Sequence, residues 1–149
     1  MIRRTLAASL MVVLSSPVWS FECFLTLVKD SCWTNYNVSV DVVDASTLQK
    51  LFTVTAPAGQ SWAREKFACT PQQTLQYIAS FNPIFWQNDE GKTYPGVRSW
   101  TLPAKVNPSD LAWTIPVCYS EEFSQVPLPP EAKGNCTCDF DSIPAPKPN

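Results

Sequence analysis

The sequence predicts an all-β protein: a single antiparallel β-sandwich of about seven strands, followed by a proline-rich tail that disulfides hold against it. Several short segments alternate apolar and polar residues, and turn-forming residues separate them. Alternation with a period of two is typical of strands that bury one face. The chain of 149 residues also carries six cysteines, and an even cysteine count in a small exported domain is typical of a disulfide framework.

Residues 1–20 have the zones of a secretory signal peptide. An Arg-Arg pair opens them, a short apolar run follows, and Pro17 precedes small residues that suit cleavage after Ser20. The apolar run is too short for a membrane-spanning helix, which needs about 20 residues, and we expect no transmembrane segment elsewhere. We therefore expect an exported protein with one domain over residues 21–120 and a tail over residues 121–149. The short signal is typical of bacteria, so the periplasm is the expected compartment and the extracellular space is the alternative.

Three segments carry the clearest strand pattern. Residues 35–44 place Tyr36 and three valines on one face and polar residues on the other, and residues 74–82 alternate in the same way. Residues 111–119 also alternate but contain Pro116, which predicts an edge strand or a bulge. With the intervals between turn signals filled, the expected strands are residues 22–29, 35–44, 49–56, 60–68, 74–82, 96–102 and 111–119.

The fifth of these segments also has a feature of a helix. Thr70 and Pro71 precede it, and proline is favoured in the first turn of a helix. Apolar residues at strictly alternate positions favour a strand instead, and Pro83 ends the segment too early for a typical helix.

The run VDVVDASTLQKLFTVTAPAG, residues 40–59, resembles the first hairpin of immunoglobulin-like or transthyretin-like extracellular modules. In those modules a strand leads into a turn of the Asp-Ala-x-Thr kind, a second strand follows, and a Pro-Ala-Gly corner ends it. The resemblance implies a sandwich of that kind, and it implies no activity.

The composition of the chain excludes several kinds of chemistry. There is no histidine, which excludes Ser-His-Asp and Cys-His catalysis and every histidine zinc site. No phosphate-binding glycine loop is present, and no basic run suggests nucleic acid as a partner. The carboxylate pairs, which suit acid–base work on sugars only when they face a cleft, are Glu121-Glu122, Asp89-Glu90 and Asp139 with Asp141. We expect no catalytic residue, no metal and no cofactor.

The six cysteines are expected to form three disulfides, and six cysteines allow 15 pairings. They are Cys23, Cys32, Cys69, Cys118, Cys136 and Cys138. The last two flank Thr137, and a direct bond between them would need a strained turn. We therefore expect each to bond to a cysteine of the sandwich and fasten the tail. A redox pair and a Cu(I) site are the alternatives.

An aromatic pair at the edge of a polar turn suggests a binding surface. Phe85 and Trp86 run directly into such a turn, and Tyr94 follows it. Exposed aromatic residues often anchor protein partners, although these rings also suit a core position. The expected function is a non-enzymatic binding or assembly module that contacts other envelope proteins, as an accessory component of a bacterial cell-envelope or secretion complex. A thiol–disulfide or copper-handling protein is one alternative, and a secreted inhibitor or carbohydrate-binding module is another.

Overall fold

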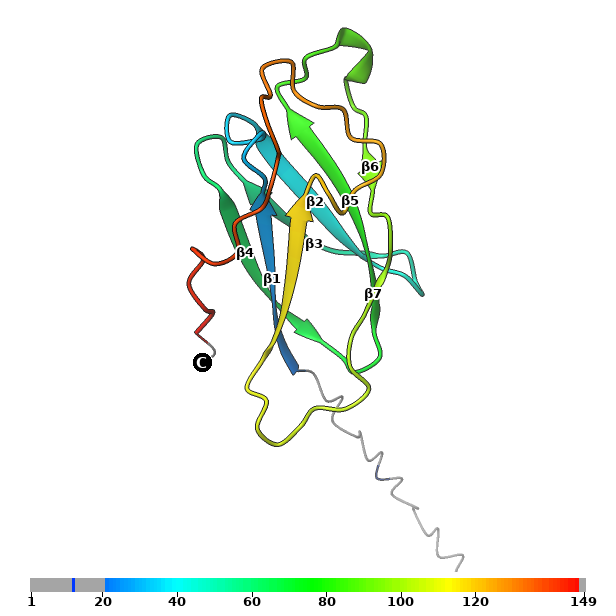
Figure 1. The fold of residues 1–149 in the computed structure, drawn as a ribbon. Helices are drawn as coiled ribbons and strands as arrows, with labels where there is room; N and C mark the ends of the chain where they lie inside the picture. The colour runs from blue at the N-terminus through cyan, green and yellow to red at the C-terminus, as the bar shows by residue number, and fades with distance from the viewer. Residues whose placement is uncertain (1–11, 13–20, 148–149) are drawn as a thin grey trace, which may run out of the picture.

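A computed structural model describes residue 12 and residues 21–147 of the chain. The predicted signal peptide and its cleavage site after Ser20 lie outside the described residues, except for residue 12. Within the described part the fold is all-β, with one short 3-10 turn (Figure 1). Its elements are β1 (Phe21–Lys29), β2 (Asn37–Asp44), β3 (Lys50–Ala56), β4 (Trp62–Cys69), β5 (Thr74–Asn82), η1 (Gln87–Asp89), β6 (Tyr94–Pro95), β7 (Trp100–Thr101) and β8 (Trp113–Tyr119). No helix in the described residues is long and apolar enough to span a bilayer.

The strands form two sheets. One has the order β4-β1-β8, and the other has the order β3-β2-β5-β6, with β7 also paired to β5. Neighbours are antiparallel except β1 and β8, which run parallel. The prediction of a purely antiparallel arrangement is therefore wrong at this pair. Parallel neighbours need a long connection, and almost the whole domain lies between these two strands.

Six of the seven predicted strands are confirmed, with ends within two residues of the expected ones. The strand predicted over residues 96–102 is confirmed only as the two-residue β7, which pairs with β5, and residues 97–99 are not a strand. The Gly96 N–H still donates to the Tyr77 carbonyl at 2.8 Å, but the next N–H, of Val97, donates to the Glu122 carbonyl at 2.9 Å. The chain thus leaves β5 after Gly96 and bonds to the segment that follows β8.

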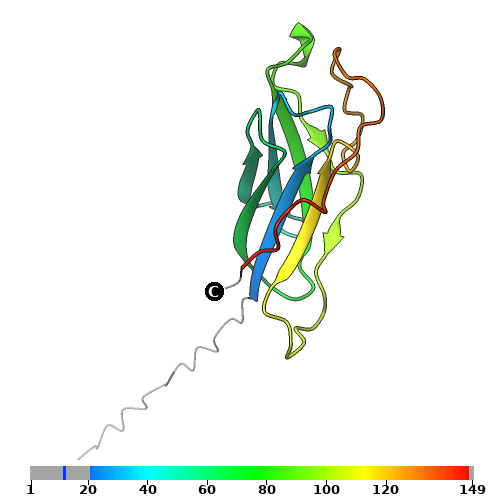
Figure 2. The same ribbon diagram turned by 60° about the vertical axis from the view of Figure 1, so that its left-hand side comes forward.

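The inward faces of both sheets build one hydrophobic core, and Figure 2 shows the sheets stacked on each other. The alternation predicted for β2 is confirmed, since Val38, Val40 and Val42 are fully buried. Along one side of the stack the rings of Phe52 on β3 and Phe67 on β4 lie 4.6 Å apart between centroids. Burial of these side chains is the main force that holds the two sheets together.

The outer face of β1 is also covered. Thr26 and Val28 point away from the core, yet they are only 5% and 1% exposed. The C-terminal segment crosses β1 and β8 on this face (Figure 2). Cys138 Sγ lies 3.4 Å from the Val28 carbonyl, and an Nη of Arg64 donates to the Pro144 carbonyl at 2.8 Å. β1 is therefore buried on both faces, in keeping with its nearly continuous apolar sequence.

The last residue of β1 is a buried lysine. Lys29 is 3% exposed, and its Nζ donates to the carbonyls of Tyr36 at 2.8 Å, Pro57 at 2.8 Å and Thr34 at 3.3 Å. Three backbone acceptors thus match the three donors of the ammonium group. Burial nevertheless lowers the pKa of Lys29 to about 8. The side chain ties the end of β1 to the two loops beside it.

We expect the free energy of unfolding to rise from pH 8 to about pH 9.5 because of Lys29. In the unfolded chain its pKa is 10.5, so over this interval the unfolded state binds the proton that the folded state has lost. The full shift corresponds to about 3 kcal/mol. Above pH 10 the tyrosines oppose this rise, because the pKa of Tyr36 is raised to about 12 in the folded state, mainly by burial. Urea unfolding of the wild type and of Lys29→Met across this range measures the effect, and equal slopes in the two proteins would contradict it.

Candidate functional site

One end of the sandwich is built from aromatic side chains around Trp33. Its indole is fully buried, and its centroid lies 5.2 Å from Tyr36, 4.7 Å from Phe81 and 4.9 Å from Tyr119. These rings come from the loop after β1, from the approach to β2, from β5 and from β8. We call this region, with the turn of residues 83–93 above it, the aromatic end. Tilted and edge-to-face ring pairs of this kind add to the stability that burial provides.

The three predicted partner-binding residues all lie at the aromatic end but differ in exposure. Phe85 is partly buried and stacks on Phe81 with centroids 5.2 Å apart. Tyr94 is 2% exposed and stacks on the same ring at 5.8 Å, so it belongs to the core and not to the exposed surface. Trp86 is 58% exposed and rests against Phe85 at 6.1 Å. Of the three, Trp86 is the residue that a partner can reach.

The first part of the tail packs on the same end. Phe123 is buried, Val126 packs against the core, and Tyr36 Oη donates to Glu131 Oε1 at 2.6 Å. Leu128 projects outward from this bend and is 63% exposed. The tail bend and the turn that carries Trp86 lie at the same end of the molecule in both views (Figures 1 and 2). The exposed part of the tail bend and Trp86 therefore lie at one end of the fold.

The hydrogen bond from Tyr36 to Glu131 is expected to hold the tail bend in place. A hydrogen bond to a charged acceptor contributes about 1.5 to 3 kcal/mol. We expect Tyr36→Phe and Glu131→Ala each to destabilise the protein, and their effects to be non-additive by about 1 kcal/mol or more. A double-mutant cycle of urea unfolding measures this coupling. Fully additive effects would show that the bond does not hold the bend.

The prediction of three disulfides is confirmed. Their Cα–Cα distances of 5.4 to 6.0 Å lie within the usual range. Cys136 and Cys138 bond to different partners and not to each other. The tail is thus bonded once to the loop after β1 and once to β8. The pairs are Cys23–Cys69, Cys32–Cys136 and Cys118–Cys138.

The tail disulfides bear on the redox and copper alternatives. Asp30, Cys32 and Cys136 have ligand atoms within 4.8 Å of one another, which is close enough for a metal site. The two sulfurs are bonded to each other, however, and a soft metal binds thiolates. No cysteine is free within the described residues. Asp30 instead accepts hydrogen bonds from the N–H groups of Cys32 and Ser120 and so organises the backbone around the bridge.

A hollow of ≈ 410 Å³ lies beside β8, and we call it the side hollow. β8 is the edge strand that Pro116 predicts, since β1 is its single neighbour in the sheet. Glu122 is held at one side of the hollow, where its carboxylate accepts from the Cys118 N–H and lies 3.6 Å from an Nη of Arg98. The lining residues come from three separate segments of the chain and are Arg98, Trp100, Pro116, Cys118, Glu121, Glu122 and Phe140.

The sequence alone missed most of the side hollow. Glu121 and Glu122 stand out in the sequence as a carboxylate pair, and the structure places both at this hollow. Trp100 is expected only as a strand residue, and Phe140 only as part of the tail. The Cys118–Cys138 bridge brings Phe140 here. An aromatic residue close to a tail cysteine is the one signal in the sequence that could have pointed to it.

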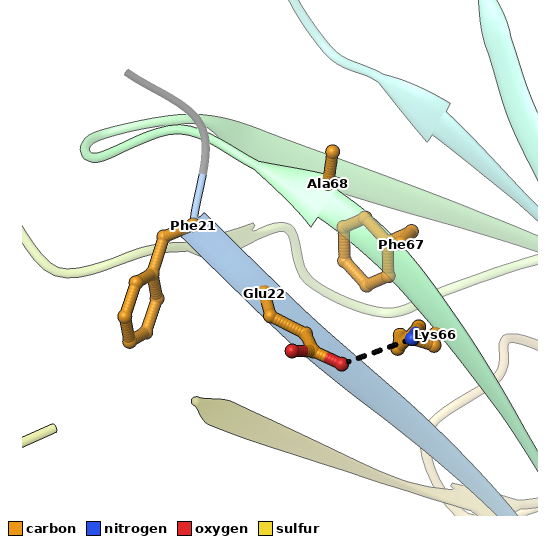
Figure 3. Close-up of a pocket in the computed structure, with 5 residues that line it drawn as sticks. All are labelled: Phe21, Glu22, Lys66, Phe67 and Ala68. Atoms are coloured by element: carbon orange, nitrogen blue, oxygen red, sulfur yellow. Dashed lines mark ion pairs between the residues drawn. The ribbon is translucent and has the colours of Figure 1, made fainter. Parts of the chain in front are cut away.

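A second hollow lies beside the start of β1 and the end of β4 (Figure 3). It measures ≈ 330 Å³, and Phe21 and Phe67 contribute rings to its lining. The carboxylate of Glu22 points across it to Lys66 Nζ at 3.3 Å (Figure 3). This ion pair is the only pair of charges among the lining residues, and each charge neutralises the other.

The remaining carboxylate pairs line neither of these hollows. Asp89 lies 3.8 Å from Lys92 on the exposed turn, and Asp139 accepts from the Asp141 N–H at 3.1 Å within a turn of the tail. Comparisons of the chain with protein-family models, with curated proteins and with solved structures found no match.

Proposed function

We propose that this protein is an exported, non-enzymatic, disulfide-stabilised binding or assembly module. It acts in the periplasm as an accessory component of a bacterial cell-envelope or secretion complex, and its partner is another envelope protein. Its scaffold is a single sandwich of the immunoglobulin-like or transthyretin-like kind with the proline-rich tail strapped to it. Three disulfides agree with an oxidising compartment.

The observation that supports this proposal is the exposed Trp86 on a rigid base. Its indole is 58% exposed, while the neighbouring Phe85 inserts into the aromatic core. Tryptophan is enriched among the residues that dominate binding energy, and such anchors work best on a support that loses little freedom on binding. Leu128 supplies further exposed apolar surface at the same end. A partner with an apolar pocket for the indole fits this surface.

Non-enzymatic function is proposed because the chain has no histidine and only one of its carboxylate pairs, at the side hollow, lines either of the two hollows. The thiol–disulfide and copper-handling alternatives require Cys136 and Cys138 as thiols. In the structure both cysteines are bonded to residues of the sandwich and its loops. No observation of the described residues favours these alternatives over a binding module.

Site-specific photocrosslinking tests the proposal. A benzoylphenylalanine residue is placed at position 86 of the full-length protein in its own cells, and a matched one at position 48. Leu48 is 71% exposed and lies in the β2–β3 turn, at the opposite end of the sandwich. We expect one discrete crosslinked product from position 86, and we expect Leu128→Ser to weaken that product. The absence of a product, or the same product from position 48, would contradict the proposal.

A further inference from the structure

The side hollow is the middle one of three adjoining hollows. It shares Arg98 with a hollow of ≈ 300 Å³ beside β6, and it shares Pro116 and Phe140 with a hollow of ≈ 330 Å³ under the tail. The three therefore form a row of adjoining hollows, here called the depression, from the edge of one sheet, past the edge strand β8, to the tail on the outer face of the other sheet. A row of hollows of this kind suits an elongated ligand better than a single small molecule.

Two aromatic rings and three charged side chains line the middle of this depression. Trp100 is partly buried, with part of its ring packed against the core. Phe140 is 39% exposed and reaches the hollow from the tail. Arg98 forms an ion pair with Glu122, and Glu121 is exposed beside them. These three side chains give the middle hollow one positive and two negative charges, and Arg64 in the hollow under the tail brings the sum over the three hollows to zero. This sum favours a neutral ligand with many hydroxyl groups over an ionic one.

A buried hydroxyl lies beneath the depression. Tyr77 is 4% exposed and lines the hollow beside β6 together with Arg98. Its Oη finds no hydrogen-bond partner among the described residues, and the same holds for Trp33 Nε1, Tyr94 Oη and Tyr119 Oη in the core. Burial raises the pKa of Tyr77, Glu122 raises it further, and Arg98 lowers it.

We propose that the three adjoining hollows form a binding groove for a neutral, linear oligosaccharide. Trp100 and Phe140 supply apolar surfaces for the faces of sugar rings. The guanidinium of Arg98 donates to sugar hydroxyls, and the carboxylates of Glu121 and Glu122 accept from them.

The fastened tail is part of this groove. Phe140 follows Cys138 by two residues, and Cys138 is bonded to Cys118 of β8. Ile143 and Pro144, which line the third hollow, lie further along the same segment, and Pro144 is held by Arg64. The groove is therefore complete only when the tail is bonded to the sandwich. This role on the side of the molecule goes beyond the protein contact proposed at the aromatic end and uses different residues.

Nuclear magnetic resonance titration of the oxidised protein without its predicted signal peptide tests the proposal. The probes are tetra-N-acetylchitotetraose and cellotetraose, which share an extended chain of β-linked sugar rings and differ in the acetamide group. We expect at least one of them to shift the indole N–H signal of Trp100 in a saturable way while the signals of Trp33 and Trp86 stay in place. If neither sugar moves the Trp100 signal at about millimolar concentrations, the proposal is wrong.

Matched variants make the test specific. Trp100→Ala and Phe140→Ala should each weaken binding by about tenfold, whereas Trp86→Ala should leave it unchanged. Phe140 is exposed on the tail, so its variant remains informative if Trp100→Ala fails to fold. Equal affinity in Phe140→Ala and the wild type would place the sugar elsewhere and overturn the groove.

The outcome also separates the two proposals. A saturable Trp100 shift without a crosslink at position 86 would retain the groove and reject the protein contact at the aromatic end. A crosslink at position 86 with no shift of the Trp100 signal would retain the protein contact at the aromatic end and reject the groove.

Discussion

Replacing Cys32 and Cys136 together with alanine is expected to lower the free energy of unfolding by about 4 kcal/mol or more. Their bridge closes the longest loop of the three, since the two cysteines are 104 positions apart in the sequence. A bond that closes a longer loop removes more conformational freedom from the unfolded chain. The bridge also holds the tail beside the loop after β1, where the Ser31 N–H donates to the Thr137 carbonyl at 3.1 Å. Losing it should therefore free the middle of the tail as well.

The Cys118–Cys138 pair provides the matched comparison. It spans 20 residues, so its removal should cost about 3 kcal/mol, less than removal of the longer bridge. Urea unfolding under non-reducing conditions, followed by tryptophan fluorescence, gives both values. A larger loss of unfolding free energy on removal of the shorter bridge would contradict the view that these bridges stabilise the protein mainly by closing loops.

Replacing Trp33 with alanine is expected to lower the free energy of unfolding by about 3 to 5 kcal/mol, which is the second large effect. The indole is fully buried, and four aromatic rings lie within 6.2 Å of it between centroids. Its removal leaves a cavity that these rings fill only in part, since they are fixed to different strands and loops. The cavity should also loosen the base under Trp86, so the photocrosslink at position 86 should weaken.

Trp86→Ala is the control for this effect, because its indole is 58% exposed. We expect it to change the free energy of unfolding by no more than about 0.5 kcal/mol. Thermal or urea unfolding of both variants measures the difference. Similar losses for Trp33→Ala and Trp86→Ala would mean that Trp33 is not the centre of the aromatic end.

Local patterns in the sequence were enough to predict most of the strands. The valines of β2 alternate with polar residues, and each of the three alternating valines is fully buried. Pro116 predicted an edge strand because proline cannot donate to a neighbour on that side, and β8 lies at the edge of its sheet. The alternation of apolar residues and the missing N–H of proline are properties of the local sequence, so they can be recognised without knowledge of the fold.

Pairings between distant segments could not be predicted in this way. The parallel contact of β1 with β8 joins the two ends of the domain, and no local pattern specifies it. The failure of residues 96–102 as a strand depends on the bond from the Val97 N–H to the Glu122 carbonyl, which the fold alone brings together. Six cysteines allow 15 pairings. Contacts between distant segments of the fold decide which of them forms.

The candidate sites show the same limit. Trp86 was predicted as a possible anchor and is exposed, whereas Tyr94 was grouped with it and is buried by stacking on Phe81. Sequence neighbours in a turn can face opposite directions, and the packing of the ring decides which one reaches solvent. The side hollow combines Trp100, Glu121 and Phe140 from three separate segments. It depends on the position of the tail in the fold, so local sequence patterns do not predict it.

A non-reducing peptide map of the exported protein, with alkylation of any free thiols, tests most directly that the tail is fastened to the sandwich. The predicted result is a peptide pair that joins Cys32 to Cys136, a second that joins Cys118 to Cys138, and no alkylated cysteine. Both proposed binding surfaces include tail residues, so both depend on these bonds. Free thiols at Cys136 and Cys138, or a bond between these two, would contradict the fastened tail and favour a thiol–disulfide or copper-handling function instead.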